Sequence, residues 1–291
     1  MNNGYIDLHV HSTASDGKFS PEQIIQMCKQ NKVSCISLTE HYNLGSYKKA
    51  KFAANGEIEI IPGIEIGASL LDLGYSKNHI CHILAYFPSY NICKILDEYE
   101  ASRDICVRKT LKKIQKHIPI TYSQVLKYAR DKKSIGRFDI AIALSKLGYA
   151  NDPVSAYGDF LDAGKSFYVD RIKMTTSELI KKIRQVHGVP VLAHPKSLKM
   201  SFTDMEIFLS KLKEYGLEGI EVYNSHHTKE QQDIFKGFAE EFELVTTVGS
   251  DFHSFFQENI HIGLGINENL KIDDYNIITE LKARHSIIIS N

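Results

Sequence analysis

Tyr5-Ile-Asp-Leu-His-Val-His-Ser12 is the stretch of sequence around which the rest of the chain is organised. Strand-forming residues fill positions 5–10, and Ser15-Asp16-Gly17 has the composition of a turn. Residues two apart in a strand point to the same face, so His9 and His11 project side by side. Two neighbouring imidazoles at a strand end are half of a metal site, although two histidines also fall in a strand by chance.

The composition indicates a globular protein without an extreme charge. The chain has 291 residues, 43% of them hydrophobic, which is enough for one large domain or a domain with an insertion. Its 35 basic and 35 acidic residues balance, so no overall charge points to nucleic acid or membrane. Five cysteines without paired spacing predict reduced thiols and a cytoplasmic protein. We expect no signal peptide and no membrane span.

Seven apolar segments are predicted to be strands, mostly separated by helical patterns. The predicted strands are 5–10, 33–38, 57–66, 79–87, 189–193, 219–223 and 244–248. The helical patterns among them cover 20–31, 176–187, 203–215 and 228–241. Strands that alternate with helices favour an α/β fold with a parallel sheet, and seven such units most economically close into a distorted seven-stranded (β/α)7 barrel. An open doubly wound sheet is the alternative.

Residues able to bind metals recur at or just after the C-terminal ends of these strands. They are His9, His11, His41, Glu65, His194, Asp251 and His253, with Asp16 in the turn after the first strand. In a parallel barrel this rim carries the active site, so we expect these side chains to converge. His82 lies inside its strand, where alternation with Leu84 and Tyr86 directs it inward.

Nine candidate ligands are too many for one tetrahedral or octahedral ion. They fit two or three divalent ions that share a bridging carboxylate, and Mn, Fe and Zn all accept imidazole and carboxylate ligands. Such ions lower the pKa of bound water and polarise a P=O or C=O bond. No cysteine stands at the strand ends, which argues against a structural thiolate zinc site, and no Gly-x-Ser-x-Gly segment offers a serine nucleophile.

Residues 101–170 interrupt the alternation of strands and helices. Their patterns are helical, at 102–117, 122–130, 139–147 and 154–162. We therefore expect a barrel formed by residues 1–100 and 171–291, and a helical insertion that acts as a lid over the substrate. The insertion holds 13 Lys or Arg and 7 Asp or Glu, a surplus of +6. Such a lid beside a metal rim suits an anionic substrate, whereas a solvated lysine-rich helix face is the plain alternative.

Six motifs, taken together and in order, resemble the PHP (polymerase and histidinol phosphatase) family. They are Asp7-Leu-His9-Val-His11-Ser12, Thr39-Glu40-His41, Pro62-Gly63-Ile64-Glu65, Cys81-His82-Ile83-Leu84, Ala193-His194-Pro195 and Gly249-Ser250-Asp251-Phe252-His253. The resemblance covers nearly the whole chain and is strongest to the branch with a helical insertion in a seven-stranded distorted barrel. It implies a hydrolase acting on phosphate esters of nucleotides, either 3′,5′-bisphosphonucleotides or the 5′ ends of short RNA.

The resemblance also implies how the nine ligands divide among three ions. The first ion would take His9, His11, Glu65 and Asp251, the second Glu65, His82 and His194, and the third Asp16, His41 and His253. A hydroxide bridging the first two ions would be the nucleophile, attacking phosphorus in line with the leaving oxygen. Glu65, Asp251 and His194 are accordingly the residues expected to support catalysis.

Substrate contacts are expected mainly from the insertion. Ile135-Gly136-Arg137-Phe138-Asp139 resembles the Gly-Arg-Pro-His segment with which the family opens its lid helix and meets phosphate, and Arg137 suits a forked phosphate contact. Phe138-Asp139 replaces Pro-His, which leaves the exact substrate open. Arg103 and Arg108, on the first lid helix, are further candidates.

Two features outside the insertion bear on the same site. His226 and His227 follow the sixth strand at the predicted rim, where they would serve as substrate contacts, as a general acid or as an exposed helix cap. Thr39-Glu40-His41-Tyr42 differs from the family's Thr-Asp-His-Asp. Glu40 can still accept hydrogen bonds behind the ligands, whereas Tyr42 removes a carboxylate.

Three other functions stay open on the sequence alone. A histidinol-phosphate phosphatase fits the family at large, but a cationic amino alcohol gains little from a basic lid. An amidohydrolase acting on C–N bonds usually carries a carboxylated lysine, and no lysine stands at a predicted strand end. A PHP module that binds metal without catalysis would not need nine intact ligands. The expected partner is a small phosphorylated substrate, with no duplex nucleic acid and no membrane; the oligomeric state is left open.

Overall fold

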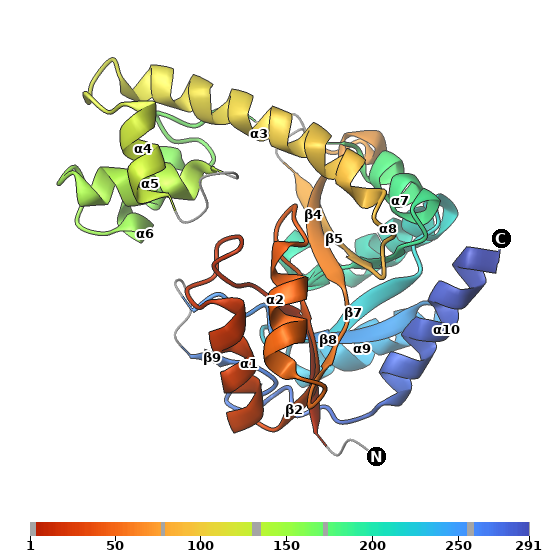
Figure 1. Cartoon of the computed structure of the whole chain (residues 1–291). Coiled ribbons are helices and arrows are strands. Elements are labelled where there is room, and N and C mark those ends of the chain that lie inside the picture. Colours follow the sequence, from red (N-terminus) through yellow and green to blue (C-terminus); the bar gives the residue numbers. More distant parts are fainter. Residues whose placement is uncertain (1–3, 77–78, 130–134, 171–173, 255–258, 291) are drawn as a thin grey trace.

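The computed structural model describes residues 4–76, 79–129, 135–170, 174–254 and 259–290. It shows a mixed α/β body from which a long helix extends, carrying a group of shorter helices at its far end (Figure 1). No helix among these residues combines the length and the apolar composition that a membrane crossing requires.

Two main sheets form the body. The smaller sheet is parallel and contains, in order, β1 (Tyr5–Val10), β2 (Val33–Leu38) and β3 (Glu59–Ile60). The larger sheet contains, in order, β4 (Gly63–Ser69), β5 (Ile80–Tyr86), β6 (Val189–Leu192), β7 (Gly219–Asn224) and β8 (Val245–Gly249). A short antiparallel pair, β9 (Ile260–His261) and β10 (Gly265–Ile266), follows. The predicted strands are thus all present, with the run 57–66 broken at Ile61-Pro62.

The expectation of an all-parallel sheet is wrong at β5. This strand runs antiparallel to its neighbours β4 and β6, whereas β6, β7 and β8 pair in parallel. The connection from Ser69 to Ile80 has a single 3-10 turn, Leu71–Leu73, in its described part, and the connection is too short for the crossover that a parallel neighbour needs. The chain therefore turns back beside β4.

The two sheets meet without closing into a barrel. Among the described residues, the isolated bridges Val10↔Phe252 and His41↔Glu65 are the only pairings between them, not a continuous ladder. The predicted closed seven-stranded barrel is therefore replaced by two sheets that face each other. The C-terminal ends of β1, β2, β6, β7 and β8 still lie together, because each of the two sheets keeps its parallel strands.

Helices cover the outside of the sheets. They are α1 (Pro21–Gln30), α2 (Gly45–Ala54), α7 (Thr176–Gln185), α8 (Phe202–Tyr215), α9 (Lys229–Glu241) and α10 (Asn276–Ser290). Capping side chains begin four of them at or within two residues of a predicted helix start: Ser20, Thr175, Ser201 and Thr228 each accept a hydrogen bond from a backbone N–H of the first turn. The sequence analysis predicted neither α2 nor α10.

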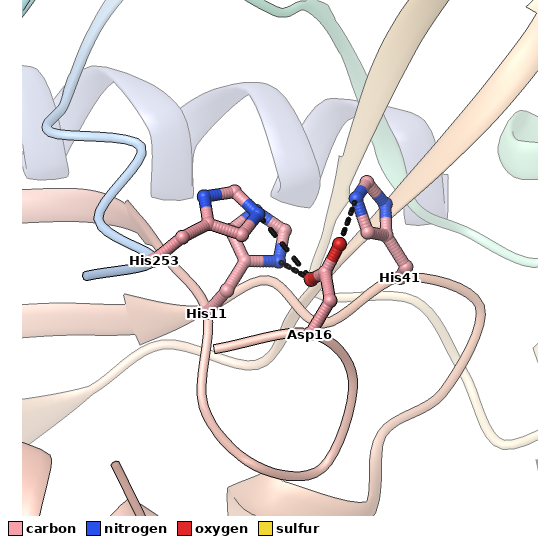
Figure 2. Close-up of side chains that lie close together, drawn as sticks. All are labelled: His11, Asp16, His41 and His253. Atoms are coloured by element: carbon pink, nitrogen blue, oxygen red, sulfur yellow. Dashed lines mark ion pairs between the residues drawn. The ribbon is translucent and has the colours of Figure 1, made fainter. Parts of the chain in front are cut away.

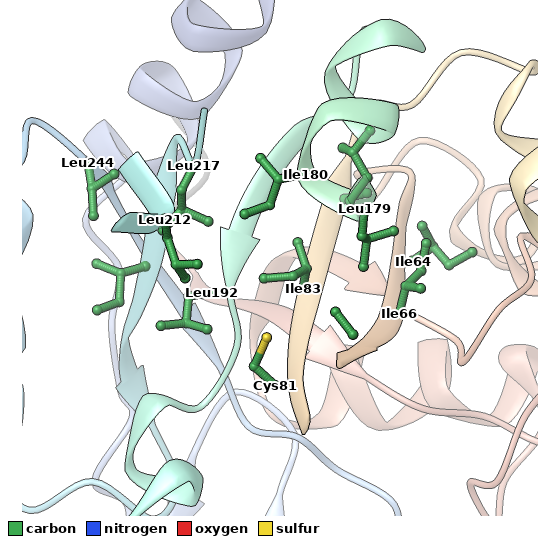
Figure 3. Close-up of a cluster of buried hydrophobic side chains, with 14 of the residues drawn as sticks. Ile64, Ile66, Cys81, Ile83, Leu179, Ile180, Leu192, Leu212, Leu217 and Leu244 are labelled. Carbon is green, nitrogen blue, oxygen red and sulfur yellow. The ribbon is translucent and has the colours of Figure 1, made fainter. Parts of the chain in front are cut away.

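Alternation along β5 separates two apolar cores. Cys81 and Ile83 pack outward against α7, where they meet Leu179 and Ile180 (Figure 3). Leu84 and Tyr86 point the other way, into the core between the two sheets that also holds Ile6 and Leu8 of β1. His82 shares this inner face with Leu84 and Tyr86, as the sequence pattern indicated. Because the apolar residues on both faces of β5 are buried, the strand cannot shift by one residue, and this fixes the face to which the His82 side chain points.

The described residues between β5 and α7 form helices and turns and contain no strand. Their helices are α3 (Ile92–Ile114), α4 (Tyr122–Tyr128), α5 (Arg137–Lys146) and α6 (Pro153–Ala156), followed by a π-helical turn at Tyr157–Leu161. Position 130, the predicted end of the second helix, lies outside the described residues. The division of the chain at residues 101 and 170 stays a prediction, and α3 runs across the first of these positions.

The insertion has an apolar core of its own. Val107 and Leu111 of α3 pack there against Val125 of α4 and Leu144 of α5. The first turns of α3 belong instead to the core of the body, where Ile92, Ile95 and Leu96 are buried. One helix thus anchors the insertion in the body and carries the separate core away from it (Figure 1).

Candidate metal centre

The structure brings all nine predicted ligands together at one mouth of the body. They form three overlapping groups, and within each group the ligand atoms lie within 4.8 Å of one another. The groups are His9, His11, Glu65 and Asp251; Glu65, His82 and His194; and His11, Asp16, His41 and His253. No other group of this kind occurs in the part of the chain that the structure describes.

The first group surrounds Oε2 of Glu65. This atom lies 3.4 Å from His9 Nε2 and 3.2 Å from His11 Nε2. Asp251 Oδ1 lies 3.4 Å from each of the same two nitrogens. Alternation along β1 directs both imidazoles to one side, and Asp251 stands two residues after the end of β8, in a left-handed conformation with φ 56°. Four side chains from three strands therefore face one small space.

The second group uses the other oxygen of the same carboxylate. Glu65 Oε1 lies 2.7 Å from His82 Nδ1 and 3.0 Å from His194 Nε2. Because its two oxygens serve two different groups, Glu65 has the arrangement of a bridging ligand. The antiparallel pairing of β4 and β5 makes this possible, since it places Gly67 opposite His82 two residues from Glu65.

The third group is centred on Asp16, in the turn after β1 (Figure 2). Asp16 Oδ1 lies 3.3 Å from His253 Nε2 and 3.6 Å from His11 Nδ1, and Oδ2 lies 3.5 Å from His41 Nε2. The resemblance placed His11 with the first ion alone. In the structure its ring stands between two groups, with Nε2 toward Glu65 and Nδ1 toward Asp16.

Many ligand atoms are buried without any hydrogen-bond partner. They are His9 Nε2, His11 Nε2, Asp16 Oδ1, His41 Nδ1, Glu65 Oε2 and His82 Nδ1. Buried polar atoms in proteins are ordinarily paired, so unpaired imidazole nitrogens and carboxylate oxygens that face one another need a different partner. Divalent metal ions fit both the donor set and its geometry.

Carboxylates and imidazoles of the centre strongly shift each other's pKa values. Burial by itself lowers the pKa of His11, but the carboxylates of Asp251 and Glu65 beside its ring outweigh burial and raise this pKa to about 10. Burial raises the pKa of Glu65, yet the surrounding imidazoles hold it well below the usual range. His41 is the exception, because burial lowers its pKa to about 3. Metal ions therefore compete with protons at some of these nitrogens.

Glu221 is a buried carboxylate that the sequence analysis did not single out. Its Oε1 lies 3.0 Å from His9 Nδ1, while Oε2 accepts hydrogen bonds from the backbone N–H of His194 at 2.6 Å and from Asn224 Nδ2 at 3.1 Å. A carboxylate behind a ligating histidine fixes the ring orientation. An acid within the apolar run Gly219-Ile-Glu-Val-Tyr223 was the signal that could have revealed it.

Two further acids hold the loops that carry the ligands. Glu40 accepts hydrogen bonds from the backbone N–H of Ser12 and the hydroxyl of Ser15, so it fixes the turn that leads to Asp16, in the supporting role expected for it. Asp7 accepts hydrogen bonds from the backbone N–H groups of Ser250 at 2.8 Å and Gly263 at 2.7 Å. The two hydrogen bonds of Asp7 connect β1 with the segment after β8 that carries Asp251 and His253.

Tyr42 replaces a carboxylate of the family pattern with an apolar ring and a hydroxyl. The ring lies 6.0 Å from that of His41 and 4.9 Å from that of Tyr99 on α3, centre to centre. Its hydroxyl accepts a hydrogen bond from the backbone N–H of Gly67, and the hydroxyl of Tyr99 donates to the carbonyl of the same residue. Tyr42 therefore connects the metal centre with the base of the insertion.

The arginines predicted to contact substrate lie on the insertion, and none of them lines the cavity at the metal centre. Arg137 begins α5, donates to the carbonyl of Leu161, and lies 4.7 Å from the ring centre of Tyr168. Arg103 lies 6.0 Å from the ring centre of Tyr42. Arg108 is exposed on α3 and paired with Asp104.

The substitution at Phe138-Asp139 has a local structural role. The Asp139 carboxylate accepts a hydrogen bond at 2.8 Å from the backbone N–H of Gly136, the residue before α5. An acid in the first turn also suits the positive end of a helix. The carboxylate is buried in this position, so it caps α5.

A cavity of about 550 Å³ opens directly beside the metal centre. It is lined by His41, Glu65, His82, His194, Lys196, Ser197, Lys199, Asn224, His226, His227, Asp251 and His253. His226 and His227 thus lie at the rim, as predicted. His227 is buried, its Nδ1 lies 2.8 Å from the Val222 carbonyl, and burial lowers its pKa to about 4. With this pKa the ring is uncharged at neutral pH, which argues against the role of general acid suggested for it.

Comparison with curated proteins identifies relatives along most of the chain. The model of the PHP domain matches residues 7–165. A 5′-3′ exoribonuclease of Haemophilus influenzae is 28% identical over 256 residues, which are 85% of this chain and 89% of that protein. A 3′,5′-nucleoside bisphosphate phosphatase of Chromobacterium violaceum is 26% identical over 256 residues, covering 86% of this chain and 87% of that protein.

Two solved structures share the fold over 96% of either chain. One is a Bifidobacterium adolescentis protein assigned as a metal-dependent phosphoesterase, with a TM-score of 0.79 and 24% identity. The other is an amidohydrolase of Chromobacterium violaceum with bound sulfate and no metal, with a TM-score of 0.78 and 24% identity. Since the family model matches more than half of the residues, this chain belongs to the PHP domain family, whose members among these relatives hydrolyse phosphate esters.

Proposed function

We propose that this protein is a metal-dependent phosphoesterase that hydrolyses phosphate esters of nucleotides, either 3′,5′-bisphosphonucleotides or the 5′ ends of short RNA. The observation that carries the proposal is the position of Glu65, whose two oxygens face two neighbouring ligand groups. The relatives named as exoribonuclease and bisphosphate phosphatase support the same substrate class.

Two or three ions of Mn, Fe or Zn fit the three ligand groups. Bound there, divalent ions supply a polarised phosphoryl oxygen and an activated water. The chain contributes the geometry: Glu65 holds adjacent groups at a fixed separation, while His194 and Asp251 complete them from β6 and β8. These three residues have the catalytic role in the proposal, because they line the cavity in which the reacting phosphate would lie.

The insertion, residues 101–170, is the substrate lid in this proposal. Arg137 suits a forked phosphate contact, since the Leu161 carbonyl and the Tyr168 ring hold its guanidinium in one orientation. Arg103 supports the same face from α3. Arg108 has the weakest case, because Asp104 already neutralises it on the exposed side of the helix.

The two histidines after β7 contribute in different ways. His226 is exposed at the edge of the cavity and can contact substrate directly. His227 is neutral, so if its Nδ1 proton is donated to Val222, its Nε2 can only accept a hydrogen bond. We expect it to shape the cavity wall and not to transfer a proton.

The proposal is tested by substrate profiling of the purified protein with Mn²⁺. The substrates are adenosine 3′,5′-bisphosphate, a 5′-phosphorylated RNA oligomer and histidinol phosphate, assayed for released phosphate and for released mononucleotides. We expect turnover of the nucleotide substrates and little of histidinol phosphate. Turnover of histidinol phosphate alone would show that the substrate class is wrong.

A variant pair excludes contaminating phosphatases. His194→Ala removes a ligand of the second group, whereas His285→Ala removes a histidine on α10 whose Nδ1 bonds only to the carbonyl of His187, away from the metal centre. Activity that is lost in the first variant and kept in the second belongs to this protein. Equal activity in both variants would contradict the proposed site.

A further inference from the structure

The segment after His194 forms a cationic wall beside the metal centre. It is the 3-10 turn Pro195–Leu198, which is preceded by the predicted ligand His194 and followed by Lys199. Both flanking residues have left-handed backbones, with φ 26° at His194 and φ 54° at Lys199. Non-glycine residues adopt this conformation at a cost, and such strain clusters at functional sites. The turn places Lys196 and Lys199 in the cavity lining.

Neither cavity lysine is neutralised by a carboxylate of the residues that the structure describes. The Lys196 ammonium instead donates to the carbonyl of His226 at 2.6 Å. That bond uses one of its three donors and holds the charge across the cavity edge.

The remaining described wall of the cavity suits an anion. Its only acids are Glu65 and Asp251, which belong to the metal groups. The other polar side chains near the lysines are Ser197, Asn224 and His226, none of which carries a negative charge. Apart from these two metal ligands, an anion beside Lys196 would therefore meet cations and neutral donors.

The lysines and the insertion approach the metal centre from different sides. Lys196 and Lys199 follow β6 and lie beside the second ligand group, through His194. The insertion approaches the third group, since Arg103 lies over the ring of Tyr42, next to His41. A phosphate at the metal centre thus has cations on two sides.

We propose that Lys196 and Lys199 form a second phosphate subsite, which binds a phosphate of the substrate next to the one being hydrolysed. The proposal rests on the proposed nucleotide phosphoesterase function and specifies its substrate. A 3′,5′-bisphosphonucleotide has one phosphate besides the reacting one and can occupy one side only. A 5′-phosphorylated oligonucleotide has phosphates in both directions. The lysine wall therefore favours short RNA over a bisphosphonucleotide.

The test compares two substrates in charge-removing variants. Lys196→Met, Lys199→Met and the double variant are assayed on a 5′-phosphorylated RNA trinucleotide and on adenosine 3′,5′-bisphosphate. We expect the double variant to lose about tenfold or more in kcat/KM on the trinucleotide, mainly through KM, and about twofold or less on the bisphosphate. Its salt dependence on the trinucleotide should weaken by about 1.4 in the slope of log(kcat/KM) against log salt, as for two lost contacts to a single strand.

Two controls separate a subsite from a general field effect. Lys211→Met removes the same charge from α8, outside the cavity, and should leave both substrates unaffected. Lys196→Arg keeps the charge and should retain most of the trinucleotide activity. Equal losses on both substrates, or no loss on the trinucleotide, would overturn the proposal.

Binding measurements test the lysine subsite independently of the proposed catalytic function. A fluorescent 5′-phosphorylated trinucleotide is titrated into wild type and the double variant with Ca²⁺ in place of Mn²⁺, and anisotropy is recorded. About tenfold weaker binding in the variant supports the subsite even if wild type hydrolyses neither substrate, an outcome that would reject only the function. Unchanged affinity overturns the subsite even if wild type is active.

Discussion

The metal centre and the insertion hold their functional side chains by different means. In the centre, ligands from separate strands are buried, and Glu221, Glu40 and Asp7 fix them or their loops from behind. In the insertion, Arg137 and Arg103 lie on helices that surround a small separate core. The centre therefore resists any change in its ligands, whereas the insertion can change its surface without disturbing its fold. We expect the centre to determine the chemistry and the insertion to determine the substrate.

The sharpest test of this contrast is Glu65→Gln. The amide cannot act as an anionic bridge between two groups, so kcat should fall by about 10³-fold or more, with loss of bound metal. Metal content by plasma emission and kcat on the best nucleotide substrate are the measurements. A variant that keeps a tenth of the activity would show that no single carboxylate links the groups.

Glu221→Gln tests the supporting layer of the centre. Its side chain bonds to His9 and to the backbone of His194, so the amide should weaken metal affinity by about 10- to 100-fold. Added metal should restore most of the kcat, which distinguishes a positioning residue from a ligand. Isothermal titration calorimetry with Mn²⁺ gives the metal affinity. Unchanged affinity in a folded variant would mean that Glu221 serves packing alone.

Metal binding should also depend on pH. The pKa of His11 is raised to about 10 in the metal-free protein, so its imidazole carries a proton at pH 6 to 8 that an incoming ion must displace. Affinity should therefore rise with pH, by about tenfold per unit for each proton displaced. Calorimetry in two buffers of different ionisation enthalpy counts the protons released. A count of zero would contradict the assigned charge state.

Arg137→Lys should give the smallest effect and the opposite kinetic pattern. Lysine keeps the charge but loses the fork, so KM should rise about three- to tenfold with kcat and metal content unchanged. Steady-state kinetics on the RNA trinucleotide measure both constants. A fall in kcat together with metal loss would show that the insertion also supports the centre, which would end the contrast between the two regions.

Local sequence patterns predicted most elements and every member of the three ligand groups. The strands follow from apolar runs and the helix starts from capping residues such as Ser20 and Thr228. The start of α2 carries no capping signal, because Leu44 provides no capping side chain. The start of α10 does carry one that went unused, since the Asp274 side chain accepts a hydrogen bond from the backbone N–H of Asn276. Glu221 escaped because a lone acid in an apolar strand has no local partner.

The sequence by itself determined which side chains stand at strand ends and on which face, because alternation and turn residues act over a few positions. Only the tertiary structure decided that β5 runs antiparallel and that the two sheets do not close. It also decided that the two oxygens of Glu65 face different groups and that His11 stands between two of them. The alternation of apolar and polar residues is the same in parallel and antiparallel strands, so it does not predict strand direction. Whether one ligand serves two groups depends on segments that are far apart in the chain. Distances between such segments are set by the packing of the whole body.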